Sequence, residues 1–147
     1  MIRNGRFDDI PAIVGMAREF WGHTVYDEEF EPDQVERMAE MCIQQDLMSV
    51  LVVNDIVRGF ACGVRGPLLA NASVFAGTEI AWWVQPEHRG GKNGIQLLRH
   101  IELLAKEAGV KYWNMVYMES SMPQSIRRIY EKTGYIKNEV VFTKVLK

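Results

Sequence analysis

The sequence has few of the features that mark secreted, metal-binding or membrane proteins. Its two cysteines, Cys42 and Cys62, stand in apolar runs without the spacing of a metal site or a disulfide framework. No stretch approaches the roughly 18 apolar residues of a membrane span, and MIRNGRFDD carries no apolar segment behind its basic residues. We therefore expect buried free thiols, no membrane partner and a cytoplasmic protein, in the host cytoplasm if the source is viral.

A strong charge of one sign is also absent. Seventeen Lys and Arg face nineteen Asp and Glu, for a formal charge of -2. No global field attracts nucleic acid, so we expect no nucleic-acid partner, and any anion site must be local. The three histidines, His23, His88 and His100, lack a third ligand at metal-site spacing, so we expect no metal site and give them no catalytic role.

The remaining composition is that of an ordinary globular protein. Hydrophobic residues make up 48% and charged residues 24% of 147 residues, which predicts a single domain over residues 1–147. Apolar spacing predicts helices from Asp8 or Asp9, from Pro32, over 93–108 and over 123–133. Strands are predicted near the start and in MSVLVVN, IVRGFACGV, VFAGTEIAWWV, KYWNMVYM and VVFTKVL, with RGPLLANAS as a mobile loop.

This order of elements is β-αα-βββ-α-β-α-β. It combines antiparallel hairpins with one β-α-β crossover, so we expect an α/β fold (α+β) with a central mixed, mostly antiparallel sheet and helices on both faces.

One segment, PEHRGGKNGIQLL at 86–98, places glycines and basic residues between a predicted strand and a predicted helix. A helix start offers unpaired N–H groups, and Gly90, Gly91 and Gly94 leave room for a phosphate to approach them. Arg89 and Lys92 add positive charge. A flexible loop with solvated charges explains the segment equally well. The phosphate loops G-x-x-x-x-G-K-[ST] and G-x-G-x-x-G do not match.

Two motifs occur together in the sequence, RGGKNG at residues 89–94 and IYEKTGY at residues 129–135. Together they resemble the GNAT family of acetyl-CoA-dependent N-acyltransferases. RGGKNG is similar to the family's pyrophosphate loop, Q/R-x-x-G-x-G/A, with Lys92 where the first glycine usually stands, and IYEKTGY is similar to a family helix ending L-Y-E-K-x-G-F. The resemblance implies an acyl-CoA N-acyltransferase fold with acetyl-CoA as cosubstrate. It implies cofactor-binding roles for Trp82, Trp83, Val84, Arg89, Gly90, Gly91, Lys92, Asn93 and Gly94.

The resemblance also implies an acid and a base. Acyl transfer needs a deprotonated amine, and Glu79 on the strand before the loop is the first choice of general base. Glu119 is the alternative base or a water-orienting residue. Tyr130 is the expected general acid for the departing thiolate. Without the resemblance, the residue pattern favours Glu79 as an exposed strand residue or salt-bridge partner, and Tyr130 as part of an apolar core.

The acceptor is the least determined part. The connection HTVYDEEFEPD, residues 23–33, holds five carboxylates, which would attract a cationic amine, although such a run of charges more often forms a solvated face. We expect a small-molecule or peptide amine acceptor and leave a homodimer open. A non-catalytic acyl-CoA-binding or interaction module is the rival interpretation, based on Lys92 and on Pro123, which stands seven residues before Tyr130 where the family often has an asparagine. A nucleic-acid-binding domain is weaker because the net charge is negative.

Overall fold

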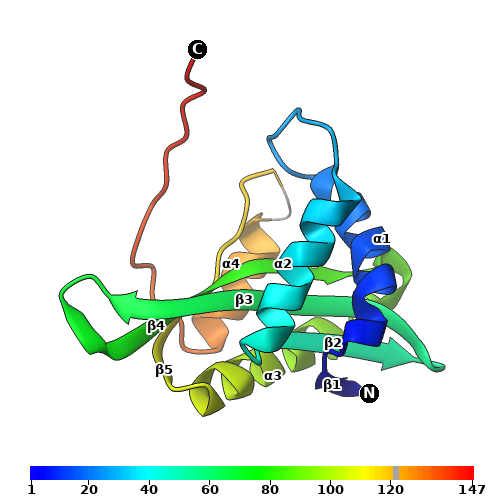
Figure 1. Cartoon of the computed structure of the whole chain (residues 1–147), viewed down its shortest axis with the longest axis horizontal. Coiled ribbons are helices and arrows are strands. Elements are labelled where there is room, and N and C mark those ends of the chain that lie inside the picture. The colour runs from blue at the N-terminus through cyan, green and yellow to red at the C-terminus, as the bar shows by residue number, and fades with distance from the viewer. Residues whose placement is uncertain (121–122) are drawn as a thin grey trace.

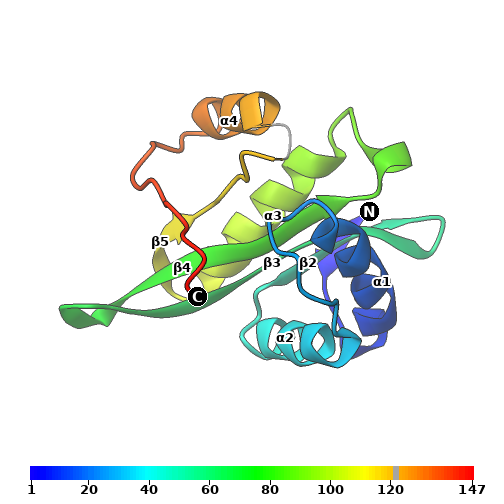
Figure 2. The same ribbon diagram turned by 90° about the horizontal axis from the view of Figure 1, so that it is seen from above.

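The computed structural model describes residues 1–120 and 123–147, and it has one sheet between two layers of helices (Figures 1 and 2). In chain order the elements are β1 (Ile2–Asn4), α1 (Ile10–Trp21), α2 (Pro32–Gln44), β2 (Met48–Val53), β3 (Ile56–Leu68), β4 (Asn71–Val84), α3 (Asn93–Glu107), β5 (Val110–Asn114) and α4 (Pro123–Lys132). Short 3-10 turns span Phe7–Asp9 and Pro86–His88.

The sheet follows chain order, β1-β2-β3-β4-β5. The first three pairings are antiparallel and β4 pairs with β5 in parallel, with α3 as the crossover between them. Asn54 and Asp55 form the tight β2–β3 turn with positive φ angles of 50° and 63°, which Asn and Asp tolerate better than most residues. The expected mixed, mostly antiparallel sheet is confirmed.

Helices cover both faces of the sheet, as predicted (Figure 2). α1 and α2 pack on one face around Phe60 and Trp83, and α3 packs on the other around Leu97 and Ile101. Because side chains alternate along a strand, neighbouring residues of β4 enter different cores. Trp83 faces α1 and α2, and Trp82 faces α3.

The predicted loop over 65–73 is wrong. β3 continues to Leu68 and β4 begins at Asn71, so the segment is a long β-hairpin with a short turn. Gly66 and Pro67 lie within the ladder, opposite Ala76 and Phe75. Cross-strand pairing here overrides the weak strand propensity of glycine and proline.

The predicted strand over residues 140–146 is also wrong. The chain after Tyr135 is extended but makes no ladder with any described strand (Figure 1). Its apolar side chains stay in solvent, with Phe142 92% exposed and Leu146 86%. β-Branched residues favour extended backbone, but a strand also needs a neighbouring edge and a face to bury.

Candidate functional site

The site begins where β4 and β5 part. Parallel pairing ends at Thr78 and Asn114, and β4 then continues alone on that side to Val84. The register with β3 shifts so that Gly63 faces Glu79 and Cys62 faces Ala81, which leaves Ile80 as a β-bulge. Beyond Thr78, no described strand lies beside this edge of β4.

The open edge offers backbone groups from alternate residues. Gln85 donates its N–H to Arg58 O at 2.9 Å, so the amides of Gln85 and Trp83 face β3. By the same alternation, the backbone groups of Trp82 and Val84 face the open side. Arg89 Nε donates to Val84 O at 2.7 Å, which agrees with this orientation.

The glycine loop follows directly. Gly90 and Gly91 have φ angles of +86° and +58°, a left-handed conformation that side chains disfavour. Lys92, in contrast, has φ -105° and ψ -8°, which any residue adopts. The turn that the family pattern assigns to one glycine is thus made one and two residues earlier, and lysine fits at 92 without strain.

The first turn of α3 is open for an anion. Its first ladder bond runs from Gln96 N to Lys92 O, so the amides of Asn93, Gly94 and Ile95 have no carbonyl partner within the described helix. A Cβ on Gly94 would lie 3.4 Å from the Trp82 ring. The Trp82 indole N–H is buried without a partner among the described residues. These donors fit a phosphate-bearing ligand.

Glu79 lies at the parting of the strands. Its side chain is buried, at 6% exposure, and Val116 N–H donates to its Oε2 at 3.2 Å. Burial raises the pKa of Glu79 to about 7, against the opposing effect of the Val116 N–H. The alternative reading of Glu79 as an exposed strand residue is wrong, and no salt bridge to it occurs among the described residues.

Tyr130 reaches the same residue from α4. Its hydroxyl donates to Val116 O at 2.5 Å, and its side chain is 7% exposed. Burial, and then the charge of Glu79, raise the pKa of Tyr130, which keeps the hydroxyl protonated. Its ring lies 6.0 Å from that of Trp82. Glu79, Val116, Tyr130, Trp82 and Gly94 therefore form one connected set.

Comparison with known proteins agrees with this arrangement. The model of the acetyltransferase (GNAT) family matches residues 11–135. The chain belongs to the GNAT acetyltransferase family. A search of curated protein sequences finds no match. GNAT enzymes use acetyl-CoA as the acetyl donor and act on amine acceptors.

Solved structures show the same fold at low identity. A predicted acetyltransferase from Clostridium acetobutylicum, solved with acetyl-CoA, has a TM-score of 0.76 and 16% identity, covering 99% of this chain and 95% of the other. A ribosomal-protein-alanine N-acetyltransferase from Brucella melitensis has 0.73 and 15%, covering 99% of each. Glucosamine-6-phosphate N-acetyltransferase from Arabidopsis thaliana has 0.75 and 14%, covering 100% and 98%.

Two residues predicted for the GNAT site, Arg89 and Trp83, have side chains on the α1 side of the sheet, away from Val116. The guanidinium of Arg89 stacks on the Trp83 ring, 4.3 Å from its centroid. Trp83 in turn donates its indole N–H to Glu19 at 3.2 Å, on the α1 side of the sheet. Arg89 and the side chain of Trp83 are therefore engaged with each other rather than with the set around Val116.

Glu119 is not brought to Glu79 by any contact in the described structure. It is exposed, in the turn that follows the coil after β5. Sequence reasoning missed Val116, which joins the two candidate catalytic residues through its backbone. No side-chain pattern can signal such a role, because any residue except proline supplies the same N–H and C=O groups.

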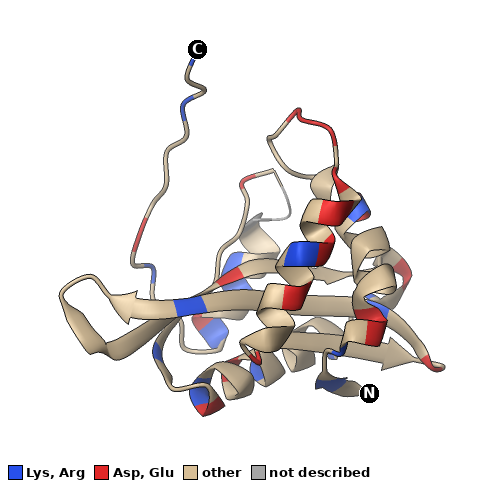
Figure 3. Cartoon of the chain, viewed as in Figure 1, with Lys and Arg blue, Asp and Glu red and all other residues tan. Residues whose placement is uncertain are grey.

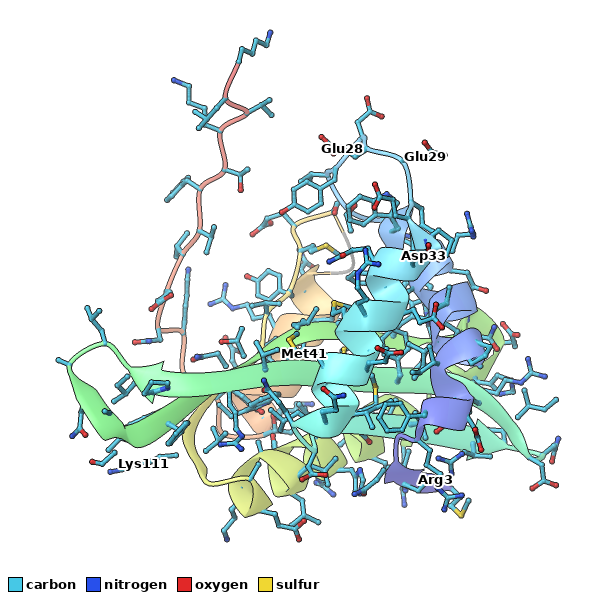
Figure 4. All side chains as sticks on the ribbon, viewed as in Figure 1. Arg3, Glu28, Glu29, Asp33, Met41 and Lys111 are labelled. Atoms are coloured by element: carbon cyan, nitrogen blue, oxygen red, sulfur yellow. The ribbon has the colours of Figure 1, made fainter. Side chains whose placement is uncertain are left out.

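The acidic α1–α2 connection projects from the end of α1 (Figure 3). Glu28 and Glu29 point outward at its tip (Figure 4). Ser120 donates to His23 O at 2.8 Å, so this connection touches the one between β5 and α4. A surface hollow nearby is lined by residues 29–33 and Arg37 and includes none of the candidate catalytic residues.

In the described residues, no group of three or more His, Cys, Asp or Glu side chains is placed to hold a metal ion. None of the helices described has the length and hydropathy needed to cross a bilayer. Both cysteines are buried free thiols, as expected.

Proposed function

We propose that this enzyme transfers the acetyl group of acetyl-CoA to a primary amine by direct attack, with Glu79 as general base and Tyr130 as general acid. The observation that carries the proposal is their convergence on Val116, whose N–H donates to Glu79 and whose C=O accepts from Tyr130. Glu79 and Tyr130 both lie where β4 and β5 part. Transfer of an acetyl group from a thioester to an amine requires a proton to leave the amine and a proton to reach the sulfur.

The base step addresses the protonated state of the acceptor. An amine with a pKa near 10.4 is neutral in only about one molecule in 2,500 at pH 7, a deficit of roughly 4.6 kcal/mol. Glu79 has a pKa of about 7, close to that optimal for a general base at neutral pH. Glu79 takes the extra proton of the ammonium form and so frees the lone pair for attack on the carbonyl carbon, and the second proton leaves the nitrogen for solvent as the tetrahedral intermediate collapses. Glu119, exposed and without contact to Glu79, is the less favoured base.

The acid step follows at the leaving group. As the carbon–sulfur bond breaks, Tyr130 gives its hydroxyl proton to the sulfur. Its raised pKa keeps that proton in place until a stronger base than water develops beside it. The backbone groups of Trp82 and the N–H of Val84, which face the open edge, would hold the cofactor arm, while Val84 O accepts from Arg89. The amides from Gly90 to Gly94 would hold the pyrophosphate, with Lys92 beside it.

The acceptor class follows from charge. Five carboxylates lie in the α1–α2 connection, which touches the chain between β5 and α4 through Ser120 and His23. A cationic amine is therefore the acceptor that we propose. The names of two structural neighbours give an amino sugar phosphate and a ribosomal-protein alanine as their acceptors, so the fold alone does not choose. We also propose one acetyltransferase domain over 1–147, acting in a reducing cytoplasm.

The direct test is calorimetric titration with CoA, followed by thiol release from acetyl-CoA in the presence of amine and peptide pools. We expect CoA binding and amine-dependent thiol release that is lost in Glu79→Gln. Absence of CoA binding would contradict the proposal.

The rival, a module that binds acyl-CoA without turnover, predicts binding with no thiol release and no effect of Glu79→Gln. Of its two supports, Lys92 is weakened by the ordinary backbone conformation at that position, and the lack of the family's usual asparagine still stands.

A further inference from the structure

Helix α4, which carries Tyr130, has little packing of its own. Among its described side chains Tyr130 alone is buried, with Ile126 and Ile129 partly so. A short amphipathic helix with one buried side chain has few contacts that fix its position. The hydrogen bond from the Tyr130 hydroxyl to Val116 O fixes one end of this side chain, and a further contact is needed to hold α4 behind it.

The turn after α4 provides that contact. Gly134 has φ +95°, which reverses the chain so that Tyr135 N–H donates back to Tyr130 O at 3.0 Å. The two rings then lie 5.4 Å apart at 46°. Tyr135 therefore contacts Tyr130 through both its backbone and its ring.

Tyr135 is itself fastened to α3. Its hydroxyl donates to Glu102 Oε1 at 2.7 Å, a bond between partly buried groups. Burial, and then the hydrogen bond to Glu102, raise the pKa of Tyr135, so the hydroxyl remains a donor at neutral pH. A hydrogen bond to a charged acceptor is stronger than one between neutral groups.

Glu102 lies on α3, the helix that follows the glycine loop. It follows Gly94 by eight residues, about 12 Å along a rigid helix axis. We propose that the Glu102–Tyr135 hydrogen bond positions the Tyr130 hydroxyl relative to the end of α3 that holds the cofactor. This inference rests on the proposed function, because it assigns Glu102 and Tyr135 as positioning residues for its general acid.

The test compares Tyr135→Phe, which keeps the ring, with Tyr112→Phe, which removes an exposed hydroxyl from β5. We expect Tyr135→Phe to lower kcat about tenfold, less than the hundredfold that a 1 Å misplacement can cause. KM for acetyl-CoA and the Kd for CoA should change less than about twofold, and Tyr112→Phe should match the wild type. A raised KM at unchanged kcat, or no effect of Tyr135→Phe, would overturn the proposal.

Two further comparisons separate positioning from general stability. Glu102→Ala should reproduce the fall in kcat, and Glu102→Gln, which keeps an acceptor, should restore most of it. Because Tyr135 acts through Tyr130, the double variant Tyr130→Phe, Tyr135→Phe should be no slower than Tyr130→Phe alone. Multiplying effects would contradict the proposal.

Hydrogen exchange in the unliganded chain keeps the two proposals separable. Residues 124–132 should exchange faster in Tyr135→Phe than in the wild type, with 97–105 of α3 unchanged. If the wild type shows no turnover with any amine, the proposed function fails, and hydrogen exchange alone tests whether Tyr135 holds α4 in position. Unchanged exchange in α4 of Tyr135→Phe overturns the positioning role, and faster exchange confined to α4 supports it.

Discussion

The two halves of β4 differ in what lies beside them. From Phe75 to Thr78 the strand pairs with β3 on one side and with β5 on the other. From Glu79 to Val84 it keeps β3 but has no described strand on the second side. The first half builds the sheet, and the second leaves backbone groups without a described strand partner and holds a buried carboxyl group.

This difference has an energetic side. In the open half a carboxyl group is buried with one backbone N–H as its hydrogen-bond partner, an arrangement that opposes ionisation. In the paired half Thr78 is exposed and costs nothing comparable. Strained or poorly satisfied groups collect where chemistry is done, since the surrounding structure must hold them there.

Neutralising Glu79, in the open half of β4, should have the largest effect on activity. Glu79→Gln keeps the size of the side chain and an acceptor for Val116 N–H but cannot take a proton. We expect turnover to fall about 10³-fold, within the range that general bases contribute, with unchanged CoA binding. The neighbouring Thr78→Val, in the paired half, should keep wild-type turnover. Thiol-release kinetics with CoA calorimetry measure both, and equal turnover in all three proteins would contradict the assignment of Glu79.

The same substitution should stabilise the fold at high pH. The pKa of Glu79 is raised from 4.5 to about 7 on folding, so the folded state binds more protons between these values and stability falls as pH rises. Above pH 7 the ionisation of buried Glu79 lowers the free energy of unfolding by about 3 kcal/mol. Glu79→Gln should therefore gain about 3 kcal/mol over the wild type at about pH 8, and less than about 1 kcal/mol at about pH 5.

Urea denaturation of both proteins at the two pH values measures the difference. The other ionisable groups are common to both chains and cancel. A gain that does not depend on pH would mean that Glu79 ionises on folding as readily as an exposed carboxyl group. The surroundings of Glu79 would then be wetter than the 6% exposure of this residue indicates.

Local patterns predicted much of this arrangement. Helix α3 and its glycine loop follow from residue spacing and from glycine punctuation, which depend only on neighbouring residues. The strand expected at 140–146 failed, although its composition is right, because pairing depends on a partner edge far away in sequence. The role of Val116 could not be predicted either, since a backbone group leaves no mark in the sequence.

A smaller effect is expected in the loop that continues from the open half. Gly91 has φ +58°, where a Cβ costs roughly 1–2 kcal/mol. A substituted chain would move the amides of residues 92–94 away from this conformation, so Gly91→Ala should weaken CoA binding about tenfold. Gly15→Ala, within α1 and with open space around its Cβ, is the matched control and should leave CoA binding unchanged. Equal calorimetric affinities for all three proteins would mean that the left-handed turn does not shape the loop.

The smallest effect is expected at Lys92, although the family pattern usually has glycine there. Its φ of -105° needs no glycine, and its side chain is exposed, so Lys92→Gly should change CoA affinity by less than about threefold at physiological salt. Lys92→Glu, which reverses the charge beside the first turn of α3, should weaken binding more, and the difference should shrink as salt is raised. Calorimetric titrations of CoA at low and high salt separate these contributions. Tighter binding by Lys92→Gly at both salt concentrations would show that lysine strains the loop, and the turn at Gly90 and Gly91 would then not replace the glycine of the family pattern.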